Sequence, residues 1–256
     1  MKHVQCERDG AVQCIAINRP EKKNALTAEM YGALADAVEQ AEAAPSVRVL
    51  LLHAMGDAFT GGNDLLDFIQ KPWSGQQMPP AVRFIQSVVH ANKPVVAAVQ
   101  GLAVGVGVTI LLHCDLVYAA EGSKFIMPFI DLGIVPEAAS TVLLPALVGR
   151  QGAAELLMLG TPFDASRAHE LGLVNTVVTP NSLFATALQS AQRLAEKPFG
   201  ALLACKRLMK EATQAEVNRA LREEVKEIRE RLDSPETKEA LAAFVEKRKP
   251  DFSRFR

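Results

Sequence analysis

The chain has 256 residues, of which 49% are hydrophobic and 22% are charged, and its formal net charge is -1. This composition excludes an intrinsically disordered chain, and the balanced charge argues against a dedicated binder of nucleic acid or of anionic membranes. The length suits one large domain or two modest ones with a sizeable core.

The cysteines and the N-terminus indicate the compartment. Cys6, Cys14, Cys114 and Cys205 form no C-x-x-C pair, so neither a zinc knuckle nor a redox motif is present. The first ten residues are polar and lack the apolar run of a signal peptide. We therefore expect a reducing, cytoplasmic setting and no metal site.

The first part of the chain predicts strands that alternate with helices. Period-two alternation predicts a strand over Ala11–Ile17, after an extended segment over His3–Glu7. Thr27 is a suitable N-cap for a helix whose apolar positions recur at helical spacing as far as Ala41. The next predicted elements are a buried strand over Val47–His53, a short helix over Asp64–Gln70, a loop over Lys71–Pro80 and a helix over Ala81–Ala91.

The apolar stretch Val95–Leu112 approaches the length of a membrane-spanning helix. Pro94 precedes it, however, and glycines at 101, 105 and 107 interrupt it. These features favour a buried strand, a glycine turn and then a buried helix over Val108–His113. We expect no membrane association.

The second part of the chain changes character near residue 196. Before it, the patterns predict extended segments over Leu116–Ala119, Gly122–Phe129 and Val174–Val178, and helices over Glu137–Val148, Gln151–Leu159 and Ala165–Leu171. A further helix is predicted over Leu183–Ala195, and after residue 196 helices are predicted over Pro198–Ala212, Val217–Leu232 and Thr237–Arg248. The chain therefore predicts an α/β core over residues 1–195 with a mainly parallel sheet, and a helical region over residues 196–256 whose amphipathic surface suits subunit contacts.

Several familiar catalytic motifs are missing. No serine lies in a G-x-S-x-G motif, and the glycine loop 56–63 lacks the lysine and hydroxyl residue of a P-loop. The loop around Gly107 has Ile110 where a dinucleotide fingerprint needs its third glycine. His113, Cys114 and Asp115 are contiguous, which favours a structural role over a shared metal ion.

Two glycine loops remain as candidates, Gly61-Gly62-Asn63-Asp64 and Gly105-Val106-Gly107. Each follows a predicted strand and opens a predicted helix, where backbone N–H groups lack internal partners and the dipole is positive. If the loops face each other, the N–H groups of Asn63 and Val106 form an oxyanion hole. The alternative is that the glycines only permit tight turns and close packing.

Glu137 is the third candidate, because it follows Pro136 and is flanked by apolar residues. In one interpretation it is a first-turn carboxylate that the helix dipole stabilises. In the other it is a general base in an apolar cleft, with a pKa raised by desolvation. The sequence leaves both open.

Taken together, these residues resemble the crotonase, or enoyl-CoA hydratase/isomerase, superfamily. The resemblance covers essentially the whole chain. The matching segments are Asn18–Leu26, Ala58–Leu65, Lys93–Gly105, Cys114-Asp115 and Ala243–Arg248.

The resemblance implies a fold and an assembly. The fold is a crotonase-like spiral of repeated ββα units, and the C-terminal helices build a homotrimer or a hexamer. Acyl-CoA thioesters would bind with the thioester oxygen between the N–H groups of Asn63 and Val106. Lys247 and Arg248 match tail residues that reach a neighbouring subunit's CoA phosphates, although a solvated charged tail is an equally good interpretation.

The resemblance also implies which residues form the substrate site. Positions that match the family's CoA and acyl site are Lys23, Asn24, Ala25, Leu26, Gly61, Gly62, Asp64, Leu65, Gly105, Pro128 and Pro136. No cofactor is implied, since acyl-CoA is the substrate.

The reaction is the remaining question. Family hydratases use two glutamates, and the matching positions here are Thr109 and Phe129, which cannot act as acid or base. Glu137 matches the catalytic glutamate of the 3,2-trans-enoyl-CoA isomerases. We therefore expect an enzyme that converts 3-enoyl-CoA to trans-2-enoyl-CoA in fatty-acid oxidation. The alternatives are hydration or other thioester chemistry on the same scaffold, or a non-catalytic acyl-CoA-binding paralogue.

Overall fold

The computed structural model describes residues 3–70 and 78–255. Residues 71–77, most of the loop predicted over Lys71–Pro80, lie outside this description. Within the described residues, the larger of two sheets has six strands in the order β1-β2-β3-β4-β6-β9. Their bounds are β1 Val4–Asp9, β2 Val12–Ile17, β3 Val49–Ala54, β4 Val95–Val99, β6 Leu116–Ala120 and β9 Thr176–Val178.

This sheet is parallel apart from the β1–β2 hairpin, as the alternation of strands and helices predicts. Successive residues of a strand face opposite layers, and both layers are apolar here. Val96 and Ala98 of β4 pack toward α7 (Leu183–Ala195), while Val95, Ala97 and Val99 join the main core. Both faces are therefore covered.

The main core lies between this sheet, two helices and a smaller second sheet. The helices are α1 (Ala28–Ala43) and α3 (Pro80–Val89). Within the described chain, the second sheet contains β5 Leu102–Val104, β7 Lys124–Ile126 and β8 Phe163–Asp164. Between β5 and β6 lie α4 (Val106–Thr109) and a 3-10 turn (Ile110–His113), so the stretch Val95–Leu112 is folded into the core as separate short elements. Among the described residues, no helix combines the length and apolar character that crossing a membrane requires.

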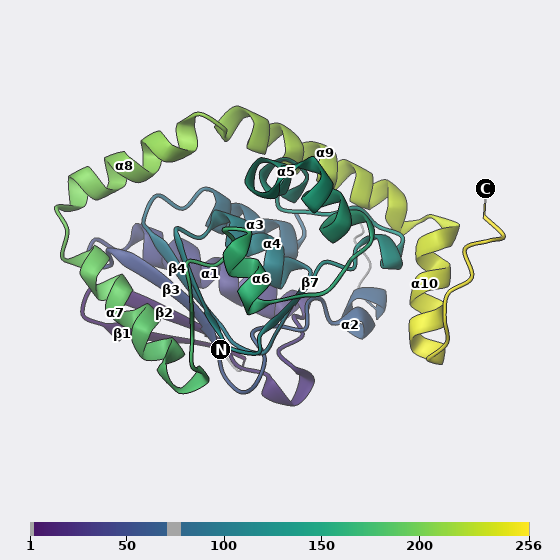
Figure 1. Ribbon diagram of the computed structural model, residues 1–256, viewed down its shortest axis with the longest axis horizontal. Coiled ribbons are helices and arrows are strands. Elements are labelled where there is room, and N and C mark those ends of the chain that lie inside the picture. Colours follow the sequence, from purple (N-terminus) through teal and green to yellow (C-terminus); the bar gives the residue numbers. More distant parts are fainter. Residues whose placement is uncertain (1–2, 71–77, 256) are drawn as a thin grey trace.

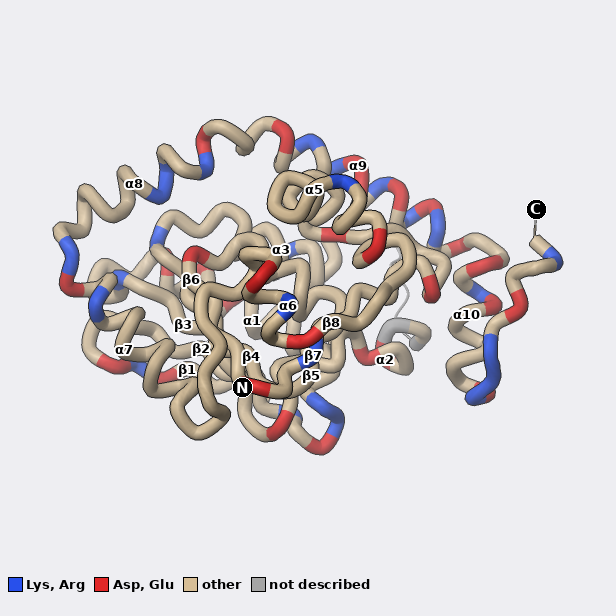
Figure 2. Tube along the Cα trace, viewed as in Figure 1, with Lys and Arg blue, Asp and Glu red and all other residues tan. Residues whose placement is uncertain are grey.

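The chain ends in three helices that extend around the core (Figure 1). They are α8 Phe199–Glu211, α9 Gln214–Leu232 and α10 Pro235–Glu246. Figure 2 shows Lys, Arg, Asp and Glu dispersed over the molecule, with both signs mixed along α9. In contrast, Leu221, Val225 and Ile228 of α9 line a cavity against the rest of the fold, so this helix is amphipathic as its periodicity predicts.

The prediction of a helix starting at Glu137 is wrong. The helix α5 spans Ser140–Met158, with a break at Gly149, and Glu137 lies before it. Ala138 and Ala139 adopt left-handed φ values of 60° and 54°. Left-handed backbone costs an L-residue roughly 1–2 kcal/mol, so the surrounding structure must hold this turn. α2 (Leu65–Gln70) and α6 (Ala165–Glu170) lie near their predicted positions.

Candidate active site

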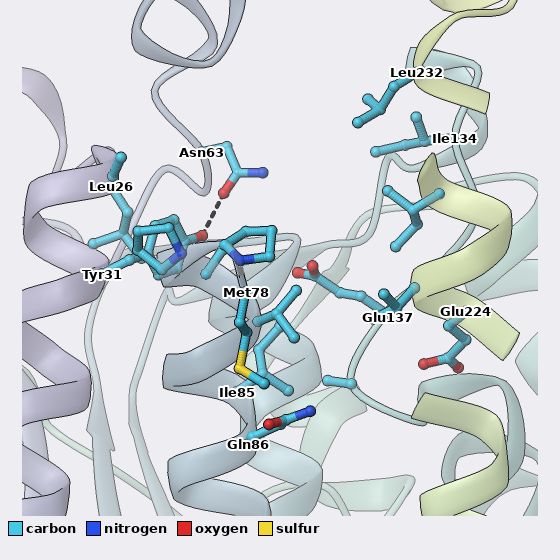
Figure 3. A pocket seen from close by; sticks show the side chains of 18 of the residues that line it. Leu26, Tyr31, Asn63, Met78, Ile85, Gln86, Ile134, Glu137, Glu224 and Leu232 are labelled. Atoms are coloured by element: carbon cyan, nitrogen blue, oxygen red, sulfur yellow. Dashed lines mark hydrogen bonds between the residues drawn. The ribbon is translucent and has the colours of Figure 1, made fainter. Parts of the chain in front are cut away.

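A cavity of about 320 Å³ lies between α3 on one side and α9 on the other. Figure 3 shows the Glu137 carboxyl directed into it, with Tyr31 and Asn63 on the opposite wall. Most of the lining is apolar. The apolar side chains from the two helices are Pro80, Ala81, Val82, Ile85, Leu221, Val225, Ile228 and Leu232. This lining suits an acyl chain or another apolar group.

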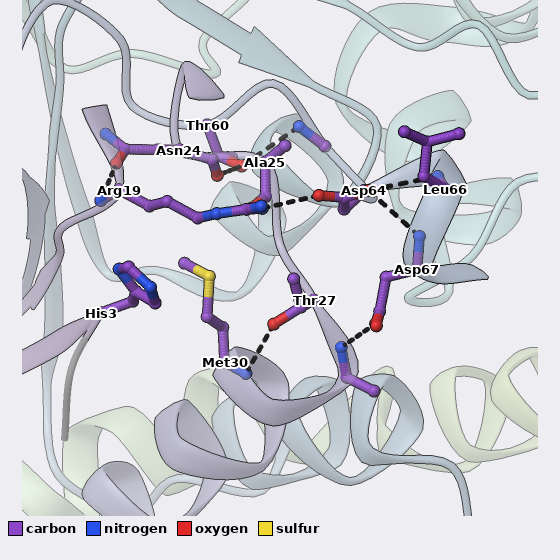
Figure 4. A network of polar contacts seen from close by, with 12 residues as sticks. His3, Arg19, Asn24, Ala25, Thr27, Met30, Thr60, Asp64, Leu66 and Asp67 are labelled. Atoms are coloured by element: carbon purple, nitrogen blue, oxygen red, sulfur yellow. Dashed lines mark hydrogen bonds and ion pairs between the residues drawn. The ribbon is translucent and has the colours of Figure 1, made fainter. Parts of the chain in front are cut away.

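The loop that carries Asn63 is held by a network of polar contacts (Figure 4). Arg19 pairs with Asp64 at 2.6 Å, and Asp64 accepts from the N–H groups of Leu66 and Asp67 at the start of α2. Asp67 in turn accepts from the first N–H of α1, at Ala28, at 2.7 Å. The Asn63 loop, α2 and α1 are thereby fixed relative to one another.

The two candidate glycine loops run side by side. Thr60 pairs with Ala103, and the N–H of Val104 donates to the carbonyl of Thr60 at 3.0 Å. Glycine is required for this approach, because a Cβ on Gly107 would stand 2.4 Å from a methyl carbon of Thr60. Within residues 3–70 and 78–255, neither the N–H of Asn63 nor that of Val106 has an acceptor. Both therefore remain able to donate to a ligand.

The two residues nevertheless differ in position. Asn63 lines the cavity, and its side-chain oxygen accepts a hydrogen bond from the Tyr31 hydroxyl. Val106 is 3% exposed, and its side chain lines a smaller space behind Leu26, which borders both spaces. The Phe129 ring connects the two regions, since it lines the cavity and lies 3.8 Å from where a Cβ on Gly105 would stand.

Glu137 is a carboxyl group whose pKa is shifted far from its usual value in the cavity. Burial, and then the negative charge of Glu224, raise the pKa of Glu137 to about 7. Its charge in turn contributes, after burial, to raising the pKa of the Tyr31 hydroxyl well above its usual value. A carboxyl group with a pKa near 7 can accept and return a proton at neutral pH.

The other carboxyl groups in the wall already have partners. Asp64 pairs with Arg19, Asp67 accepts from Ala28, and Glu224 accepts from the start of α5. Burial would raise the pKa of Asp64, but hydrogen bonds from Arg19 and from backbone N–H groups leave its pKa below the usual value. In the part of the chain that is described, no donor reaches the Glu137 carboxylate.

The remaining predicted site residues surround this cavity without all lining it. Leu26, Asn63, Asp64 and Glu137 are in its wall. Asn24 is fully buried and donates to the carbonyls of Met55 and Ala58, so its side chain has an architectural role. The other predicted positions outside the wall are Lys23, Ala25, Gly61, Gly62, Leu65, Gly105, Val106, Pro128 and Pro136.

The basic residues predicted for CoA binding differ in their contacts. Lys23 is exposed and pairs with Asp57 at 2.5 Å. Arg248 pairs with Glu239 and Glu246, so the α10 region already holds this guanidinium. Whether Lys247 and Arg248 reach a second subunit stays a prediction.

Sequence reasoning missed Tyr31 and Glu224, and for His113 it indicated a structural role without identifying the partner. Tyr31 lies within an apolar helical stripe and is indistinguishable from a core residue in the sequence. Glu224 is one of many charges along α9, and no spacing marks it. The Nε2 atom of His113 lies 2.7 Å from the carbonyl oxygen of Ala138. Since a carbonyl oxygen can only accept, His113 is the donor. In the described ranges, no three His, Cys, Asp or Glu residues are grouped as metal ligands would be.

Comparison with known proteins places the chain in a family. The sequence profile described as enoyl-CoA hydratase/isomerase matches residues 7–254. A crystal structure of an enoyl-CoA hydratase/isomerase from Pseudoalteromonas atlantica superposes with a TM-score of 0.93 at 42% identity, covering 98% of this chain and 99% of that one.

Curated relatives carry several activity names. The 1,2-epoxyphenylacetyl-CoA isomerase of Escherichia coli is 34% identical over 99% of both chains. Enoyl-CoA delta isomerase 2 of Rattus norvegicus is also 34% identical, over 97% of this chain and 64% of its own length. Other relatives are named as hydratases. The chain therefore belongs to the enoyl-CoA hydratase/isomerase family, within the crotonase superfamily.

Proposed function

We propose that this enzyme shifts the double bond of a 3-enoyl-CoA into conjugation, giving trans-2-enoyl-CoA. The observation that carries the proposal is Glu137, a carboxyl group that faces an apolar cavity and has a pKa of about 7. A double-bond shift needs one group that removes a proton and returns it nearby. Glu137 is suited to both steps.

In the proposed reaction, the Glu137 carboxylate removes a proton from C2 of the substrate. The electron pair spreads into a dienolate, whose thioester oxygen accepts hydrogen bonds from the N–H groups of Asn63 and Val106. Glu137 then returns the proton at C4. The product has the same atoms as the substrate, and no other reactant is consumed.

The positions that match the family's hydratase glutamates support a shift rather than hydration. Thr109 is fully buried, and Phe129 places an aromatic ring in the cavity wall. Neither side chain can deprotonate a water molecule at neutral pH. Asp64, Asp67 and Glu224 already accept hydrogen bonds within the fold. The site therefore lacks a second free carboxylate comparable to Glu137 in the described wall.

The test compares two substrates with the same protein. We expect incubation with 3-hexenoyl-CoA to produce the ultraviolet absorbance of a conjugated enoyl thioester. With trans-2-hexenoyl-CoA, we expect at most slow loss of that absorbance. Rapid formation of 3-hydroxyacyl-CoA from the 2-enoyl substrate, with no turnover of the 3-enoyl substrate, would contradict the proposal.

A further inference from the structure

Glu224 connects the C-terminal helix α9 to the turn that carries Glu137. One oxygen of its carboxylate accepts from the N–H of Ala139 at 2.6 Å. The other accepts from the N–H and hydroxyl of Thr141, at 3.2 and 2.6 Å. The Glu224 side chain thus binds donors at the start of α5, although it belongs to a helix about 85 residues later in the chain.

The start of α5 needs such a partner. The N-cap residue Ala139 has no side-chain oxygen to bind the free N–H groups of the first turn. A negative charge at this end is also favoured by the helix dipole. Glu224 supplies both the acceptor atoms and the charge from another helix.

The turn is held at three points. The left-handed residues Ala138 and Ala139 are restrained by His113, which donates to the Ala138 carbonyl, and by Glu224, which accepts from Ala139. Ser140 donates from its hydroxyl to the carbonyl of Glu137 at 2.6 Å. Because Glu137 immediately precedes this turn, its direction depends on these contacts.

The charge of Glu224 also acts on the carboxyl group of Glu137. Both residues line the cavity, and the charge of Glu224 is the second cause, after burial, of the raised pKa of Glu137. Among the described residues, the other ionisable groups around the cavity are Tyr31 on α1, Asp64 just before α2 and Asp67 on α2. Behind the turn, burial lowers the pKa of His113 to about 4, which leaves it neutral.

We propose that Glu224 is a positioning residue for the reaction, which aims the Glu137 carboxylate by holding the turn at 138–141 and tunes it by its own charge. The inference rests on the proposed role of Glu137 as the base. It gives the C-terminal helix a function within the site, in addition to forming a wall of the cavity.

The test uses Glu224→Gln, with Glu223→Gln as the matched control on the same helix. Glu223 is exposed and undergoes the same chemical change. The amide of Glu224→Gln cannot accept at both oxygens, because one becomes a donor that opposes an N–H. We expect kcat to fall about tenfold or more, with the affinity for saturated hexanoyl-CoA unchanged. We also expect the pH midpoint of kcat/KM to move below the wild-type value near 7, while the control matches wild type.

A second variant keeps the inference testable if Glu224→Gln does not fold. Thr141 is exposed, so Thr141→Val should fold, and it removes the 2.6 Å hydrogen bond to Glu224. Without this bond the pKa of Glu224 rises, Glu224 is charged less often, and the midpoint moves in the same direction by a smaller amount. Wild-type kcat and midpoint in Thr141→Val and in any folded Glu224→Gln would overturn the inference.

Failure of the inference can be separated from failure of the proposed function. If Glu137→Gln abolishes turnover while the Glu224 and Thr141 variants behave as wild type, only the positioning role is wrong. If Glu137→Gln turns over the 3-enoyl substrate normally, the base itself is misassigned.

Discussion

At the residue scale, the raised pKa of Glu137 implies a cost in stability. A carboxyl group with a folded pKa near 7 and an ordinary value of 4.5 is protonated in the fold at pH values where the unfolded chain releases the proton. The free energy of unfolding therefore carries no penalty from this group below pH 4.5, and it falls as the pH rises from there through 7. Above pH 7 the ionised Glu137 lowers the free energy of unfolding by about 3 kcal/mol relative to its value below pH 4.5.

The ionisation of Glu137 predicts that Glu137→Gln stabilises the fold in a pH-dependent way. We expect the variant to unfold at a higher temperature than wild type at pH 8, with the difference vanishing near pH 4.5. Thermal unfolding followed by circular dichroism at the two pH values measures this. An equal shift at both pH values would show that the effect comes from packing and not from ionisation.

The residues around Glu137 also show a conformation that could not be predicted from the local sequence. Alanine has the best helix propensity, so Ala138 and Ala139 indicate a helix that continues back to Glu137. Their left-handed backbone depends on His113 and Glu224, which lie about 25 and 85 residues away. A local pattern cannot encode a conformation that distant side chains impose.

At the scale of elements, α8 is attached to the core through an ion pair between a buried lysine and a partly exposed aspartate. Lys206 is 5% exposed and donates to Asp115 at 2.7 Å and to the carbonyl of Lys93 at 2.9 Å. Asp115 accepts at the same oxygen from the N–H of Val95, the first residue of β4. The helix is thus joined to the start of a central strand.

Removing this lysine should therefore destabilise the protein strongly. We expect Lys206→Ala to lower the free energy of unfolding by about 3 kcal/mol, because it leaves Asp115 without its cation. The neighbouring Arg207→Ala, which breaks an exposed pair with Glu211, should cost less than about 1 kcal/mol. Urea titration of both variants measures the difference, and equal costs would contradict the account.

Most elements could be predicted from periodicity, because most of the strands and helices bury apolar residues at regular spacing. The strand at Val95–Val99 and the helix at Leu183–Ala195 are examples, and the comparisons confirm the crotonase fold. The helix predicted over Val108–His113 instead begins at Val106 and tightens into a 3-10 turn from Ile110. Its ends are set by contacts with neighbouring loops, which periodicity does not report.

At the scale of the whole molecule, the cavity is assembled from distant parts of the chain. Ile85 on α3 and Ile228 on α9 lie in opposite walls, and Leu26 and Glu137 come from the segments that precede α1 and α5. The sequence indicated Asn63 and Glu137 as members of one site, and both line this cavity. The contribution of α9 could not be predicted, because its apolar stripe is equally suited to a subunit contact.

The position of α9 in the cavity wall predicts that a larger side chain on this helix changes the preference for acyl-chain length. Ile228→Trp should fill part of the cavity and lower kcat/KM for 3-dodecenoyl-CoA relative to 3-hexenoyl-CoA by about tenfold. Lys226→Trp, at an exposed position of the same helix, should leave the ratio unchanged. If both variants alter the ratio equally, the acyl chain does not lie against α9.

The most direct measurement of the central claim is the turnover of a 3-enoyl-CoA by Glu137→Gln. The amide keeps the size of the side chain but cannot remove a proton. We predict that kcat falls about a thousandfold while the variant stays folded and binds saturated hexanoyl-CoA as wild type does. A kcat within a few-fold of wild type would show that another group moves the proton.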